Sequence, residues 1–141
     1  MRLYAESSAV LAWLLGEPRG RKTLELLSQA ELIIVSDLTL VECDRVLIRA
    51  VTLREIDEAE AARRRATLNL AASHWNVLRL QGEIVNRARR AFPSEPIRTL
   101  DALHLSCALL ARSLVPELSL LSLDRRVRAA ARILGLPLAP A

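Results

Sequence analysis

The sequence predicts an α/β protein, a three-layer α/β/α sandwich with a mostly parallel sheet of four to five strands. Short apolar runs of strand length recur along the chain, and segments with helical apolar spacing separate them. Such alternation is typical of a parallel sheet covered by helices on both faces. No repeat, low-complexity tract or internal linker interrupts the pattern, so residues 1–141 are expected to form a single domain.

Four apolar runs are predicted as strands, and a fifth is at most a short edge strand. The runs, in chain order, are 3–5, 32–35, 77–80, 118–123 and 136–138. The run 32–35 is the clearest of them, because it is β-branched and apolar and is bounded by polar residues.

Seven helices are predicted between and after these runs, over 9–15, 21–29, 38–54, 56–72, 83–91, 100–112 and 125–134. Short polar side chains precede several of them and are expected as N-caps: Ser7 or Ser8, Ser36 or Asp37, Thr99 and Asp124. The helix over 56–72 is rich in alanine and charge, with Glu60 four residues before Arg64. We therefore expect it to be a solvated arm or outer hairpin.

The composition argues against several classes of protein. With 52% apolar residues, the chain can build a core without disulfides or a structural metal. Cys43 and Cys107 have neither CxxC nor zinc-ligand spacing, so we expect free thiols and a reducing, cytoplasmic setting. No apolar run approaches the length of a membrane span, and an acid at position 6 is unlike a signal peptide.

The net charge is +4, and every basic residue except Lys22 is an arginine. The planar guanidinium group can bind two phosphate oxygens at once. This surface permits nucleic acid binding, although codon bias toward arginine would give the same composition.

Four acids, Glu6, Glu42, Asp101 and Asp124, mark a possible shared site. Three of them are expected at the ends of strands or at the helix starts facing them, where open parallel sheets bind ligands. Clustered carboxylates are stable mainly when a divalent cation offsets their repulsion. If the four acids converge, the sequence therefore predicts a metal site.

Each acid also has a structural interpretation. Glu6 would be a solvated turn residue and Asp124 only a helix cap. Asp101 would compensate the helix dipole, although the apolar helix behind it implies burial, which is costly for an acid without a partner. Glu42 would form a surface ladder with the arginines one and two turns further along its helix.

His104 shares a helix face with Asp101, three residues further on. This pair could bind a metal or act as a base, but a hydrogen-bonded structural histidine is the favoured interpretation. There is no glycine-rich phosphate loop and no recognisable Ser/His/Asp or Cys/His signature.

Four stretches of the chain, in order and at suitable spacing, resemble the motifs of the PIN-domain family, and within it the VapC-type ribonuclease toxins of toxin–antitoxin pairs. They are YAESSA at 4–9, LTLVE at 38–42, TLDALHL at 99–105 and LSLDRR at 121–126. The resemblance covers almost the whole chain. It departs at the first acid, which is usually aspartate in the family and is Glu6 here.

The resemblance implies an endoribonuclease in which Glu6, Glu42, Asp101 and Asp124 hold Mg²⁺ or Mn²⁺, and the metal activates water for attack on an RNA phosphodiester. It also implies that Ser8 and Ser122 orient ligands or water. The candidates for holding the RNA backbone are Arg45, Arg49, Arg125 and Arg126. Proteins of this type are typically dimers, and a cognate antitoxin blocks the cleft.

The extra methylene of Glu6 matters because Mg²⁺ demands near-ideal octahedral geometry. The alternative function is therefore a PIN-like module, weakened at Glu6, that binds an antitoxin or RNA without cleaving. A phosphorylated signalling receiver shares the α/β layout, but it needs a lysine after the last strand. The only lysine is Lys22, near the start of the chain.

Overall fold

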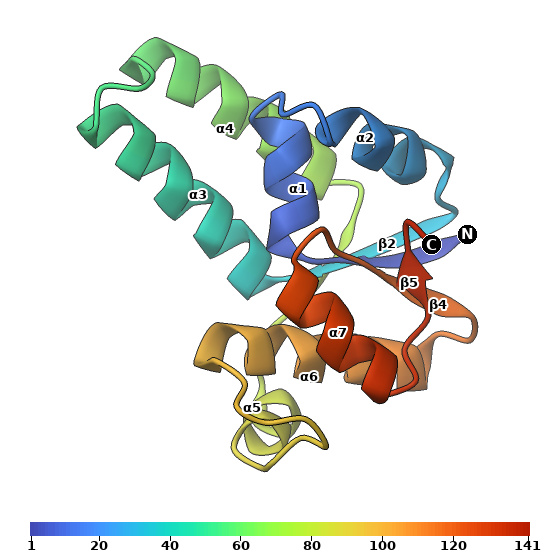
Figure 1. Ribbon diagram of the computed structural model, residues 1–141. Coiled ribbons are helices and arrows are strands. Elements are labelled where there is room, and N and C mark those ends of the chain that lie inside the picture. Colours follow the sequence, from blue (N-terminus) through green and yellow to red (C-terminus); the bar gives the residue numbers. More distant parts are fainter.

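Five parallel strands form one sheet in the computed structural model, which describes residues 1–141 (Figure 1). The strands are β1 (Arg2–Ala5), β2 (Leu32–Ser36), β3 (Asn76–Leu78), β4 (Leu118–Leu121) and β5 (Leu138–Ala139). Their order in the sheet is β3-β2-β1-β4-β5. The strands β1, β2 and β3 thus lie side by side in chain order, and β4 and β5 continue the sheet on the other side of β1. The predicted α/β fold and its parallel sheet are confirmed, including the short fifth strand.

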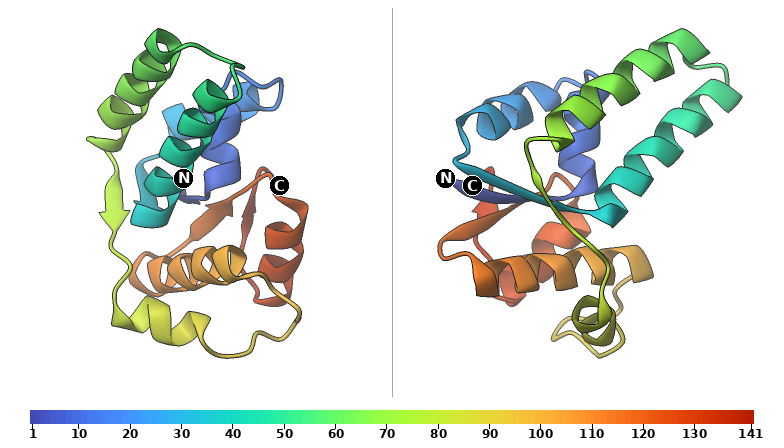
Figure 2. Two further views of the ribbon diagram at one scale, coloured as in Figure 1. Left: turned by 90° about the vertical axis from the view of Figure 1, so that its left-hand side faces the viewer. Right: turned by 180° about the vertical axis from the view of Figure 1, so that it is seen from behind.

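Seven helices cover the two faces of the sheet (Figures 1 and 2). One layer holds α1 (Ser7–Leu14), α2 (Gly20–Gln29), α3 (Asp37–Thr52) and α4 (Glu58–Ala72). The other holds α5 (Gly82–Ala88), α6 (Thr99–Leu114) and α7 (Arg125–Ile133). The helices α3 and α4 form the expected hairpin, which projects beyond the sheet (Figure 2). None of the helices is long and apolar enough to cross a membrane.

Alternating side chains of the strands fill two cores, one on each face of the sheet. In β1, Leu3 and Ala5 belong to the core under α1–α4, and Tyr4 belongs to the core under α5–α7. Cys43 lies in the first core and Cys107 in the second, and both thiols are free and buried. The prediction of two unpaired cysteines is confirmed.

The N-cap predictions were right for Asp124, right in position for Ser36, and wrong for Ser7, Ser8 and Thr99. Asp124 accepts hydrogen bonds from the backbone N–H groups of Arg126 and Val127. Thr99 is instead the first residue of α6, whose N-cap is Arg98. Ser7 and Ser8 lie inside α1, after the N-cap Glu6, and Ser36 precedes α3 without a capping bond. The three serine hydroxyls have other partners, since Ser7 and Ser8 bind carboxylates and Ser36 accepts a bond from Tyr4.

Candidate functional site

A cavity of about 380 Å³ lies at the carboxyl ends of β1 and β4, where the chain order in the sheet reverses. Such a reversal opens a crevice because the connections leave the two strands toward opposite faces. All four predicted acids line the cavity: Glu6 after β1, Glu42 on α3, Asp101 on α6 and Asp124 after β4. The fold therefore brings together carboxylates from four separate segments.

Glu6 is 5% exposed, so its interpretation as a solvated turn residue was wrong. Its Oε2 accepts hydrogen bonds from Ser8 Oγ at 2.5 Å and Ser122 Oγ at 2.8 Å. Ser8 Oγ in turn accepts bonds from the backbone N–H groups of Leu123 and Asp124. This network joins the end of β1 to the end of β4 and fixes the Glu6 carboxylate between them.

Glu42 does not form a ladder with Arg45 and Arg49, and that interpretation was also wrong. Its Oε1 lies 2.5 Å from His104 Nε2 and accepts a hydrogen bond of 2.8 Å from Ser7 Oγ. Burial alone would raise the pKa of Glu42, but the hydrogen bond and charge of His104, helped by Ser7, hold it below its usual value. Glu42 is therefore held ionised at the cavity wall.

His104 is 1% exposed and has partners at both ring nitrogens. Nδ1 lies 3.3 Å from the Tyr4 hydroxyl, which donates a hydrogen bond to Ser36 Oγ. Nε2 faces Glu42, and it is also 3.8 Å from Glu6 Oε1. The prediction of a hydrogen-bonded histidine is confirmed, and this histidine is placed between two of the four acids.

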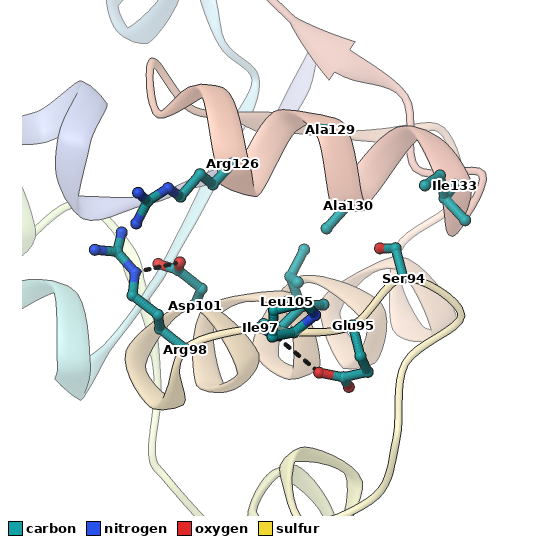
Figure 3. A pocket seen from close by; sticks show the side chains of 11 residues that line it. Ser94, Glu95, Ile97, Arg98, Asp101, Leu105, Arg126, Ala129, Ala130 and Ile133 are labelled. Atoms are coloured by element: carbon teal, nitrogen blue, oxygen red, sulfur yellow. Dashed lines mark hydrogen bonds and ion pairs between the residues drawn. The ribbon is translucent and has the colours of Figure 1, made fainter.

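The other two acids are held by groups at helix starts. Asp101 Oδ2 accepts a hydrogen bond of 3.3 Å from Arg98 Nε, one turn earlier (Figure 3). Asp124 uses Oδ1 to cap α7. Because Asp124 also lines the cavity, its capping does not use up the whole carboxylate.

The four carboxylates share one property. Each has one oxygen that accepts a hydrogen bond from the protein and one that accepts none; the second oxygens are Glu6 Oε1, Glu42 Oε2, Asp101 Oδ1 and Asp124 Oδ2. Carboxylate oxygens suit hard cations such as Mg²⁺ and Mn²⁺, so the donor set fits such an ion in kind. No three carboxylate, imidazole or thiol groups are grouped closely enough to hold one ion, so the structure itself defines no metal site.

Sequence reasoning missed the roles of Ser7 and Arg98 in the cavity. Ser7 was assigned to helix capping, and Arg98 was not considered, although its spacing of three residues from Asp101 at a helix start is a recognisable signal. Arg45 and Arg49 line a separate hollow on α3. Arg126 does not line the carboxylate cavity but lines a second cavity next to it. Arg125 lines neither of these two cavities.

Comparisons with known proteins agree with the fold. A family model described as PIN domain matches residues 3–137. Among curated protein sequences, none matches the chain.

Several solved structures have a similar fold at low sequence identity. VapBC2 from Rickettsia felis, bound to a DNA fragment from its promoter, is 13% identical with a TM-score of 0.64, over 98% of this chain and 97% of that one. VapC20 from Mycobacterium tuberculosis, a toxin that cleaves the sarcin–ricin loop, is 14% identical with a TM-score of 0.65, over 91% and 94%. A toxin–antitoxin complex from Klebsiella pneumoniae is 18% identical with a TM-score of 0.62, over 92% and 91%.

Proposed function

The chain belongs to the PIN domain family, and from this membership we propose that residues 1–141 form, as one domain, a divalent-metal-dependent endoribonuclease, the toxin of a toxin–antitoxin pair. One observation carries the proposal. Four carboxylates from distant segments line one cavity, and each keeps one oxygen that accepts no hydrogen bond from the protein. Such an arrangement is costly unless a ligand of opposite charge uses it.

In this proposal the cation is Mg²⁺ or Mn²⁺, and the residues that would hold it are Glu6, Glu42, Asp101 and Asp124. When bound, the cation lowers the pKa of water and offsets the charge that develops on the phosphate. The protein orients its own groups for this task. Ser8 and Ser122 fix one oxygen of Glu6, and His104 and Ser7 fix one oxygen of Glu42.

The RNA backbone needs cations near the carboxylates, since a polyanion would otherwise be repelled. Arg98 lines the cavity, and Arg126 lies beside it (Figure 3). Both guanidinium groups can bind phosphate oxygens in a bidentate manner. We assign the RNA contacts nearest the reacting phosphate to these two arginines.

The partners of the protein follow from the same proposal. A cognate antitoxin would cover the cavity, as the similarity to toxin–antitoxin complexes suggests. The active form would be a homodimer acting in the cytoplasm, where the two buried thiols remain reduced.

The proposal predicts cleavage of RNA that requires Mg²⁺ or Mn²⁺ and depends on Asp101. The Asp101→Asn variant removes one negative charge from the cavity and should lower the cleavage rate by on the order of 100-fold. The measurement is the rate of product formation from a labelled RNA on a denaturing gel, with and without EDTA.

Asp44→Asn is the matched control. Asp44 also lies on a helix but pairs with Arg65 outside the cavity, so this variant should cleave at the wild-type rate. Equal activity in Asp101→Asn and wild type would refute the assignment.

A second candidate function is a PIN-like module that binds an antitoxin or RNA without cleaving. The observation in its favour is that protein side chains already pair with two of the acids, His104 with Glu42 and Arg98 with Asp101. Calorimetric titration with Mn²⁺ separates the two candidates. If the wild type does not bind Mn²⁺ and the Glu6→Asp variant does, the non-cleaving binding module is favoured.

A further inference from the structure

A second cavity, of about 580 Å³, adjoins the carboxylate cavity between α6, α7 and the loop before α6 (Figure 3). Arg98 and Asp101 line both spaces. A volume of this size is typical of sites that enclose a small organic group. The second cavity therefore opens beside the groups proposed to act on the phosphodiester.

The walls of this cavity are largely apolar. Leu105 and Ala130 are buried, and Ile97, Ala129 and Ile133 complete the apolar lining. Glu95 also lines it, but its two oxygens accept hydrogen bonds from the backbone N–H groups of Phe92 and Ile97. This carboxylate is therefore engaged in shaping the loop.

The side of the cavity nearest the four acids is positively charged. The guanidinium groups of Arg98 and Arg126 point toward one another above Asp101 (Figure 3). Asp101 pairs with Arg98, whereas the guanidinium of Arg126 has no carboxylate partner. Two guanidinium groups thus lie near one acid that pairs with only one of them, and an anion placed between them would relieve their repulsion.

We propose that this cavity binds one unpaired nucleobase of the RNA substrate, with the adjoining phosphate between Arg98 and Arg126. The inference rests on the proposed nuclease function and names the part of the substrate that the site reads. A nucleotide joins a flat ring with apolar faces to an anionic phosphate, which matches an apolar cavity with cations at one side. The base must be unpaired, because a base stacked inside a duplex cannot enter a cavity.

A binding cycle tests the base assignment. One arm fills the cavity with Ala129→Leu, at an exposed position of α7 where a longer side chain does not enter the core. The other arm uses short single-stranded RNAs in which one abasic ribose is moved along the strand. Affinity is measured by fluorescence anisotropy in EDTA, so that binding is separated from cleavage.

At one position, loss of the base should weaken binding to the wild type by about fivefold, because the apolar contacts between the base and the cavity wall are lost. Ala129→Leu should weaken binding to the intact RNA by a similar factor and should cause no further loss with the abasic RNA. Ile133→Ala, which removes an exposed part of the wall, should reduce the abasic effect without any risk of overpacking. Ala66→Leu on α4 is the matched control and should leave both affinities unchanged.

The assignment is overturned if the abasic effect has the same size in wild type, Ala129→Leu and Ile133→Ala. It is also overturned if Ala129→Leu weakens binding of an antitoxin peptide but not of RNA, which would make the cavity a protein-docking site. Failure of the nuclease function is distinguishable, because the cycle needs no cleavage. If the protein cleaves RNA but the losses of affinity caused by Ala129→Leu and by the abasic ribose are additive, the nuclease function stands and the base site is rejected.

Discussion

His104 shows how a single residue can make a cluster of acids tolerable inside a protein. Its Nε2 lies 2.5 Å from one carboxylate, Glu42, and 3.8 Å from another, Glu6. Its Nδ1 faces the Tyr4 hydroxyl, whose pKa is raised well above its usual value, chiefly by burial. The imidazole ring therefore contacts the neutral Tyr4 hydroxyl through Nδ1 and faces Glu42 and Glu6 through Nε2.

At this scale we predict that replacing His104 raises the pKa of Glu42. Burial opposes ionisation of Glu42, and in His104→Gln the opposing charge of the imidazole is gone. The wild-type pKa should lie below 4.5 and that of the variant above the wild-type value. Carboxyl ¹³C NMR titration measures both.

The sign of the linked stability effect follows from the same shift. Because the pKa of Glu42 is lower in the folded than in the unfolded protein, ionised Glu42 stabilises the fold at pH values above its unfolded-state pKa. This contribution to the free energy of unfolding is lost as the pH falls through the folded-state pKa. Glu60 is an internal control, because Arg64 and Arg63 lower its pKa on the distant helix α4. An unchanged Glu42 titration in His104→Gln, or an equal shift in Glu60, would contradict the prediction.

The helices α1 and α2 approach each other closely at Gly20. A Cβ atom there would lie 2.1 Å from the Ala12 carbonyl oxygen and 2.9 Å from Trp13 Cα. Both contacts are with backbone, so neither can move aside as a flexible side chain would. Only glycine fits at the start of α2.

We predict that Gly20→Ala destabilises the protein by about 1 to 3 kcal/mol or more, as overpacking usually does. Gly82→Ala is the matched control at the start of α5, where no atom lies within 4 Å of the added Cβ. It should be neutral or stabilising by up to about 1 kcal/mol, because alanine favours the helix. Urea denaturation followed by circular dichroism measures both, and equal effects of the two substitutions would be incompatible with the contact.

The helices and strands were largely predictable from the sequence because their signals are local. Runs such as 32–35 show strand character by themselves, and Asp124 has the appearance of a cap. Capping by Ser7, Ser8 and Thr99 was predicted wrongly for a physical reason. A hydroxyl beside a helix start binds whichever partner the fold brings near, and for the two serines that partner is a carboxylate from the cavity.

The grouping of the four acids was predictable from the sequence, but their hydrogen-bond partners were not. Glu6 and Asp124 follow predicted strands, and all four acids lie in family-like motifs, which are visible in the sequence alone. The pairing of Glu42 with His104 links residues 62 positions apart, and no local pattern contains that distance. The strand order could not be predicted from local patterns either. The placement of β4 next to β1 rather than next to β3 depends on how the helices pack on both faces of the sheet.

On the scale of the whole molecule, two cores share one sheet. Tyr4 faces one core while its neighbours Leu3 and Ala5 face the other, so neither core can lose the central strand without exposing the second. Unfolding is therefore expected to be cooperative across both faces.

The two thiols can report on this cooperativity. Burial raises the pKa of Cys43 to about 12 and also raises the pKa of Cys107, so neither should react with a disulfide reagent at pH 8 while the protein is folded. We predict that both become reactive at the same urea concentration, which is also the midpoint seen by circular dichroism. Cys43→Ala and Cys107→Ala leave one reporter in each core. A lower midpoint for either thiol would mean that the two layers open separately.

The position of Arg98 between the two cavities would make the proposed ligands of the two cavities interdependent. Its Nε donates to Asp101 Oδ2, and a phosphate that takes this donor releases the Asp101 oxygen toward the other acids. A free energy of coupling must act equally in both directions, so whatever engages Asp101 must strengthen the hold of Arg98 on the phosphate by the same factor. Under this proposal, the Arg98–Asp101 ion pair would be the contact through which binding in one cavity changes the affinity of the other.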